Sequence, residues 1–392
     1  GPSQTDGTPD SAVSRSGSQT RPPETTRNDF AASALLKRRV VRPTSPSPSG
    51  SGAWPPESSV KVLSTVPVDI LFLLLGLCLL IAGGDLLVRG AVRIAERLRL
   101  SPMLIGLTVV GMGTSTPELA ASLRASLAGS PGIAIGNIVG SNIANALLIL
   151  GVAALIAPVL VSSRTLWRDG GVGLAAALAL LAAGATVGLS REAGLAFLIM
   201  MAGYIYYAWR QERAGASHSA AYDRAVAMEE VDPALVPHEQ PAGRLSVALL
   251  LFLVGLGLVV GGAGLLVNAA IAIAGQFGVS DTIIGLTVVA VGTSVPELVT
   301  SAVAAWRRQG DIALGNVLGS NIYNILFIGG LTGVIAPTTV PTSIMAFDLW
   351  ALVAILLVVM AFAFSGGRLS RKEGFVLVAA YVAYVGYTTG LF

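Results

Sequence analysis

Cysteine, histidine and charge are all scarce in this chain. Its 392 residues include one cysteine, Cys78, so no disulfide can form within the chain and no thiolate cluster can bind a metal. Its two histidines, His218 and His238, lie in one polar stretch, which leaves the apolar regions without imidazole ligands for zinc, copper or iron. Charged residues make up 12% of the chain, against about 25% in a soluble domain.

Long apolar runs take the place of the missing charges. Runs of twenty or more residues recur from about residue 68 to the C-terminus, and each is long enough to cross a hydrocarbon core of about 30 Å as a helix. We therefore expect an all-α membrane protein, embedded in a lipid bilayer, with ten transmembrane helices. The predicted spans are 67–97, 102–127, 131–158, 166–188, 191–211, 243–275, 281–306, 311–336, 345–366 and 371–391.

Composition divides the chain into four parts. Residues 1–66 are rich in Ser, Pro and Gly and have no apolar period, which predicts a disordered tail. The polar stretch 212–242 separates two five-span groups, 67–211 and 243–392. The predicted topology places most basic residues near the spans on the same side of the membrane as this stretch. The positive-inside rule therefore makes 212–242 a central cytoplasmic loop and places both termini outside. These basic residues are Arg93, Arg97, Arg99, Arg164, Arg168, Arg307, Arg308, Arg368, Arg371 and Lys372.

The two groups of spans are copies of each other. The segment GLTVVGMGTSTPELAAS at 106–122 matches 285–301 at 12 of 17 positions, and 133–151 matches 312–330 at 12 of 19. Both matches have the same offset of 179 residues, which indicates an internal duplication. Because each copy has five spans, the second must enter the membrane in the opposite orientation. Such inverted repeats are typical of secondary transporters, whose sites form where the repeats meet.

One acidic residue lies deep in each repeat, within a Gly-Thr-Ser-x-Pro-Glu segment. Glu118 and Glu297 are costly at that depth unless they face a cavity or a partner. Proline removes a backbone donor and glycine permits unusual dihedrals, so we expect both helices to break there and to free carbonyl oxygens. A plain kinked helix, in which the threonine caps the second half and proline takes its first position, is the alternative for one such segment. Two inverted copies at membrane depth favour a cation site.

A second duplicated segment supplies hydroxyl and amide groups. Ser141 and Asn145 are four residues apart and share a helix face, as do Ser320 and Asn324 in the other copy. These pairs are the better candidates to face the carboxylates. Four further asparagines are equally well explained as hydrogen-bonding contacts between helices; they are Asn137, Asn142, Asn316 and Asn321.

The predicted ligands are all hard oxygen donors. Two carboxylates, hydroxyls, amides and freed carbonyls suit Ca²⁺, which takes 6–8 oxygen ligands in flexible geometry. The same two negative charges can instead be balanced by two or three Na⁺ spread over neighbouring oxygens. Since the site cannot hold both loads at once, competition between them provides a physical basis for exchange.

The duplicated GTS-x-PE and GN-x-x-GSN-I motifs resemble the alpha repeats of the sodium/calcium exchanger branch of the calcium/cation antiporter superfamily. The resemblance covers 67–392 and implies ten helices in two inverted five-helix repeats, with alternating access by sliding of the first and sixth helices. It also implies a Ca²⁺ site of Glu118, Glu297 and the carbonyls of Thr114 and Thr293. Flanking Na⁺ sites would add Ser115, Ser141, Ser294 and Ser320, with Asn145 and Asn324 at the middle.

Asn324 departs from part of this family, because potassium-dependent exchangers have Asp at the matching position. The missing negative charge predicts a K⁺-independent Na⁺/Ca²⁺ antiporter. We expect a multi-pass protein of the plasma membrane, a transporter and not an enzyme, which works as a monomer with neither a cofactor nor a nucleic-acid partner. A Ca²⁺/H⁺ antiporter is the nearest alternative, since buried carboxyl groups can carry protons; a cation channel is a more distant one.

Overall fold

The structure is a computed structural model that describes residues 57–98, 100, 105, 108–109, 111–160, 166–213, 219–232, 236 and 244–391. Most of the predicted tail, 1–56, lies outside the described residues, as do His218 and His238. The prediction for 57–66 differs from the structure, in which helix α1 begins at Glu57.

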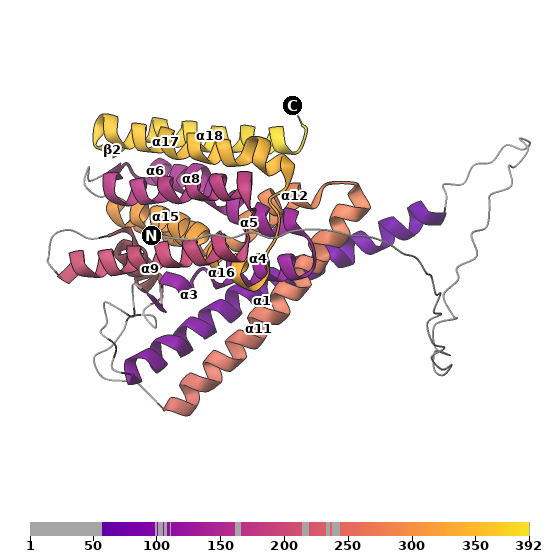
Figure 1. The fold of residues 1–392 in the computed structure, drawn as a ribbon, viewed down its shortest axis with the longest axis horizontal. Helices are drawn as coiled ribbons and strands as arrows, with labels where there is room; N and C mark the ends of the chain where they lie inside the picture. The colour runs from indigo at the N-terminus through magenta and orange to yellow at the C-terminus, as the bar shows by residue number, and fades with distance from the viewer. Residues whose placement is uncertain are drawn as a thin grey trace, which may run out of the picture. The chain divides into compact units, whose positions relative to one another are not determined.

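The described chain is almost entirely helical (Figure 1). Its first half contains α1 (Glu57–Arg97), α3 (Gly111–Gly113), α4 (Thr116–Leu127), α5 (Pro131–Ala144), the π-helical η2 (Asn145–Ile149), α6 (Leu150–Ile156), β1 (Val159–Leu160), η3 (Leu166–Gly170), α8 (Gly171–Thr186) and α9 (Arg191–Arg213). A separate helix, α10 (Ala220–Val231), lies within the central polar stretch. The second half contains α11 (Leu245–Phe277), α12 (Asp281–Ile284), η5 (Gly285–Val289), α13 (Ala290–Thr293), α14 (Val295–Trp306), α15 (Gly310–Ile322), η6 (Tyr323–Gly329), α16 (Gly330–Ile335), η7 (Ile344–Asp348), α17 (Leu349–Gly366), β2 (Arg368–Leu369) and α18 (Arg371–Thr388).

Six helical stretches are long and apolar enough to cross a membrane, and one bent pair makes a possible seventh. They cover Val66–Arg97, Pro131–Ile156, Leu166–Thr186, Leu245–Phe277, Gly310–Ile335 and Ile344–Phe364, with the bent pair at Asp281–Trp306. Of the other predicted spans, 102–127 is only partly described, and those at 191–211 and 371–391 correspond to α9 and α18, which carry charges at their ends. The exact count of ten therefore stays a prediction.

The first helices of the two repeats, α1 and α11, pack side by side (Figure 1). Their glycines make the contact: a Cβ on Gly76 would lie 2.8 Å from the Gly262 carbonyl oxygen, and a Cβ on Gly83 would lie 3.0 Å from that of Gly255. Contact positions rise along α1 while they fall along α11, so the helices are antiparallel. Small residues permit such close helix approach in a membrane.

These contacts follow the duplication. The offset of 179 residues carries Gly76 onto Gly255 and Gly83 onto Gly262, so the contact between Gly76 and Gly262 is repeated, with the partners exchanged, between Gly255 and Gly83. The β1–β2 pair, Val159 with Leu369, has its near-counterpart in the bridge between Leu189 and Thr338. An approximate two-fold relation of this kind is what inverted repeats require.

The close approach of α1 and α11 predicts a position-specific effect of added methyl groups. Gly262→Ala should lower the stability of the detergent-solubilised protein by roughly 1–3 kcal/mol, because the new Cβ meets backbone of α1 within 3 Å. Gly261→Ala is the matched control, since a Cβ there meets nothing within 4 Å. Thermal unfolding of both variants measures the difference, and equal melting temperatures would contradict the packing.

Candidate functional site

Both predicted helix breaks are present, at equivalent serines. Ser115 has φ −85° and ψ 12°, and Ser294 has φ −87° and ψ 8°, outside the helical geometry of the flanking segments. A proline enters the first turn of the following helix in each copy, and the segments on either side of Ser294 meet at 49°. Neither serine makes a side-chain capping hydrogen bond to the helix that follows it.

Each break places a buried glutamate in the first turn of the half-helix that follows it. Glu118 is 1% exposed at the start of α4, and Glu297 is 2% exposed at the start of α14. The positive end of the helix dipole favours a carboxylate at such a position. The prediction that both side chains leave the hydrocarbon for the protein interior is consistent with this burial.

Asparagines brace the two glutamates in the same way. The Asn137 amide donates to the Glu118 backbone oxygen over 3.0 Å, and the Asn316 amide donates to that of Glu297 over 3.3 Å. Each amide also donates to a serine one turn beyond its glutamate, over 2.9 and 2.8 Å. Asn137 and Asn316 therefore act as contacts between helices, the structural alternative considered for them.

Groups from the two repeats meet directly around the carboxylates. The Ser294 hydroxyl donates to Glu118 Oε1 over 3.4 Å, and the Thr293 hydroxyl lies 3.1 Å from Asn137 Oδ1. Ser141 donates to the Ala290 carbonyl over 3.4 Å. The broken segment of one repeat thus contacts the site residues of the other.

Both central asparagines lie in π-helical segments. Asn145 opens η2 and Asn324 lies in η6, and single π-helical turns of this kind often accompany functional sites. The Asn145 amide donates to Asn321 Oδ1 over 3.1 Å, which joins the repeats a second time. Asn324 is 2% exposed.

Several oxygen atoms in this region have no hydrogen-bond partner among the described residues, although they are buried. They are Glu118 Oε2, Glu297 Oε2, Asn142 Oδ1, Asn145 Oδ1 and Asn316 Oδ1. A buried polar atom left without a partner costs about 1–3 kcal/mol, and more when it is charged. Two carboxylate oxygens and several amide oxygens in one buried region form a donor set of the kind that Ca²⁺ and other hard cations prefer.

Arg224 is a site residue that sequence reasoning missed. The sequence alone places it in the polar stretch between the repeats, whereas the structure buries it completely. Its Nη2 donates to Thr114 Oγ1 (3.0 Å), Ser115 Oγ (2.7 Å) and Glu297 Oε1 (3.1 Å), and its Nη1 donates to Ser320 Oγ. The guanidinium also lies 5.2 Å from the centre of the Tyr323 ring. A usable signal was present: Ser219 followed by an alanine-rich helical run, which is the pattern of a capped helix.

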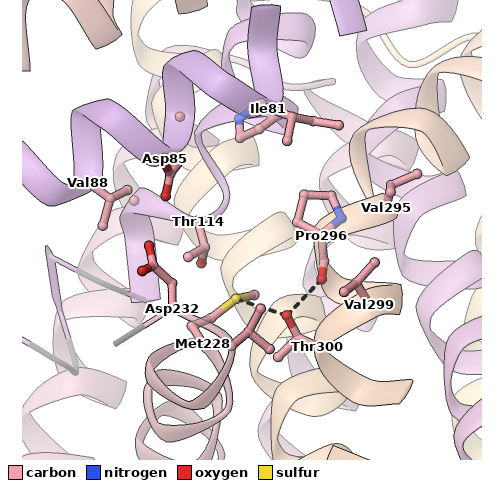
Figure 2. A pocket seen from close by; sticks show the side chains of 14 residues that line it. Ile81, Asp85, Val88, Thr114, Met228, Asp232, Val295, Pro296, Val299 and Thr300 are labelled. Carbon is pink, nitrogen blue, oxygen red and sulfur yellow. Dashed lines mark hydrogen bonds between the residues drawn. The ribbon is translucent and has the colours of Figure 1, made fainter. Parts of the chain in front are cut away.

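A cavity of about 310 Å³ lies beside this cluster (Figure 2). Ile81 and Val88 of α1 form one wall, Pro296 in the first turn of α14 forms another, and Met228 of α10 forms a third. Thr114 connects the cavity to the Arg224 cluster, because it both lines the cavity and accepts from the guanidinium. The helix that carries Arg224 is therefore also part of the cavity wall.

Comparison with known proteins agrees with this geometry. Residues 68–210 and 247–390 each match the model of the sodium/calcium exchanger protein family. The putative antiporter CaxA of Alkalimonas amylolytica is 37% identical over 81% of this chain and 97% of its own length. The sodium/calcium exchanger MaX1 of Methanosarcina acetivorans is also 37% identical, over 82% of this chain and 98% of its own.

Solved structures extend the likeness to the fold. The sodium-calcium exchanger NCX_Mj, in a crystal soaked with Na⁺ and Sr²⁺, superposes with a TM-score of 0.52 at 32% identity and covers 82% of this chain and 98% of its own. The two matched halves, the broken helices and the buried glutamates agree with the sequence resemblance. This chain is a multi-pass membrane antiporter that belongs to the sodium/calcium exchanger family.

Proposed function

We propose that this protein exchanges Na⁺ for Ca²⁺ across the membrane, independently of K⁺, with Glu118 and Glu297 as the two charged ligands. The observation that supports this most strongly is the symmetry of the two carboxylates. Each lies in the first turn of a half-helix, each is braced by an equivalent asparagine, and each keeps one buried oxygen that has no partner within the described part of the chain. Two such carboxylates match the charge of one Ca²⁺, or of two Na⁺.

Several of the remaining predicted ligands are linked to these carboxylates by hydrogen bonds, either directly or through Arg224. Ser294 contacts Glu118, while Thr114, Ser115 and Ser320 lie around Glu297 through their shared contact with Arg224. Ser141 and Thr293 both contact the Ala290 carbonyl, which we assign to a Na⁺ position. The resemblance assigns the backbone carbonyls of Thr114 and Thr293 to the Ca²⁺ site, and we retain that proposal.

Independence from K⁺ follows from the charge of the central positions. Asn145 and Asn324 are both neutral, so the proposed site has two carboxylates and no third acidic side chain. We also propose that the protein is located in the plasma membrane and that a monomer is sufficient for transport.

The first test is ion flux. In proteoliposomes loaded with Na⁺, an outward Na⁺ gradient at clamped pH should drive ⁴⁵Ca²⁺ uptake, and replacing all K⁺ by choline should leave the rate unchanged. Uptake that instead follows a proton gradient in Na⁺-free medium would identify a Ca²⁺/H⁺ antiporter. Uptake that requires K⁺ would contradict the proposal that two carboxylates, with neutral asparagines between them, make the exchanger independent of K⁺.

The second test removes each charge separately. Glu118→Gln and Glu297→Gln should each lower Na⁺-driven Ca²⁺ uptake by ~100-fold or more, since outer-shell partners of a metal already contribute ~10–100-fold. Glu192→Gln, at an exposed position in the first turn of α9, is the matched control and should transport normally. Undiminished uptake in either buried variant would remove that glutamate from the site.

A further inference from the structure

The Arg224 guanidinium contacts residues that are also proposed to hold a bound cation. It donates to the side-chain oxygens of Ser115, Glu297 and Ser320. It also donates to the hydroxyl of Thr114, whose backbone carbonyl is the proposed ligand. Arginine carries one fixed positive charge and only donor groups, so it presents to these oxygens what a metal ion presents. Its charge also offsets that of Glu297, with which it forms a buried ion pair of 3.1 Å.

The helix that carries Arg224 lies in a groove of α15. A Cβ on Gly319 would lie 2.9 Å from the Ala220 carbonyl oxygen and 3.1 Å from Arg224 Cβ, and Gly315 faces Asp223 just as closely. The equivalent glycines of the first repeat, Gly136 and Gly140, are covered by residues 285–290, which belong to the broken segment of the second repeat. The glycine face of α5 is therefore covered by a broken segment that contributes to the site, whereas the equivalent face of α15 is covered by α10.

Buried contacts hold the N-terminal end of α10. Ser219 caps the helix, and the Asp169 carboxylate accepts from the Ala220 amide over 2.8 Å. The Tyr204 hydroxyl accepts from the Ala221 amide over 3.2 Å. The Asp169 carboxylate therefore serves the N-terminal end of α10.

Polar contacts nearer the surface hold the C-terminal end. Gln309 donates to Glu230 over 2.7 Å, Arg307 lies 3.5 Å from Glu230, and Arg89 of α1 pairs with Asp232 over 2.8 Å. Partly exposed ion pairs of this kind contribute only about 0–1 kcal/mol each. The helix is therefore held at this end by contacts that can be given up at low cost.

We propose that α10 is a tethered inhibitor of the exchanger, and that the Arg224 guanidinium occupies the cation site in place of a transported ion. The inference rests on the proposed function, because it requires that Glu297 and Ser320 be cation ligands. Ca²⁺ or Na⁺ must displace Arg224 before transport begins. Withdrawal of α10 also removes one wall of the cavity beside α1 and breaks its ion pair with Arg89.

Competition of this kind predicts a gain of affinity when the charge is removed. If the site is free in about a tenth of the molecules, Arg224→Gln should lower the apparent Kd for Ca²⁺ by ~10-fold. Equilibrium ⁴⁵Ca²⁺ binding to the full chain in Na⁺-free detergent measures this shift. Arg210→Gln, at an exposed arginine near the end of α9, is the matched control and should bind as the unaltered protein does.

The same variants in proteoliposomes separate this inference from the proposed function. Arg224→Gln should show faster Na⁺-driven uptake at low Ca²⁺ than the unaltered chain. Unchanged or weaker Ca²⁺ binding by a monodisperse Arg224→Gln protein would overturn the tethered inhibitor. If a Na⁺ gradient drives uptake in neither protein, the exchange proposal fails, while the binding comparison still decides the role of α10.

A measurement on the unaltered chain covers the case in which the variant does not fold. Trypsin cleaves after arginine, and Arg224 is fully buried while Arg210 is exposed. Saturating Ca²⁺ should speed cleavage after Arg224 several-fold relative to choline, with cleavage after Arg210 unchanged, as followed by mass spectrometry. Equal protection of Arg224 with and without Ca²⁺ would overturn the inference.

Discussion

The burial of two carboxylates in a medium of low dielectric constant constrains the rest of this structure. Such groups are stable only where positive charge and hydrogen-bond donors are supplied. The helix breaks supply the positive ends of two half-helices, and the Ser294 hydroxyl donates a hydrogen bond to Glu118. What is still missing around Glu297 is a cation, and the chain itself provides one in Arg224. In the proposed mechanism, a transported ion therefore replaces a positive charge that the chain already supplies.

The duplication organises this site from helix packing down to single hydrogen bonds. The glycine contacts of α1 with α11 and the two Asn–Glu braces repeat at the same offset of 179 residues. The clear departure among the described residues is α10, which pairs with Glu297 and contributes no counterpart at Glu118. Because α10 contacts one of two otherwise equivalent halves, it can act on one carboxylate and not on the other, as the proposed inhibition requires.

Much of the architecture was accessible from residue patterns. The duplicated GTS-x-PE segments predicted two helix breaks, and both occur at Ser115 and Ser294 with nearly equal dihedrals. The extension of α1 back to Glu57 and the burial of Arg224 were not predicted, and both omissions have the same cause. Composition classed both stretches as polar, and composition does not report the long-range packing that buries a short helix. The number of spans also depends on α9 and α18, whose end charges weaken a hydropathy signal.

The sequence by itself determined the class of the protein, its internal duplication and the two buried acidic residues that we propose as ligands, because each of these depends on local composition and on a repeated spacing. Only the tertiary structure decided which groups converge on those ligands. Arg224 lies 73 positions before Glu297 in the sequence and makes a hydrogen bond with it in the folded chain. Such a contact depends on how α10 packs against α15, which no local pattern encodes.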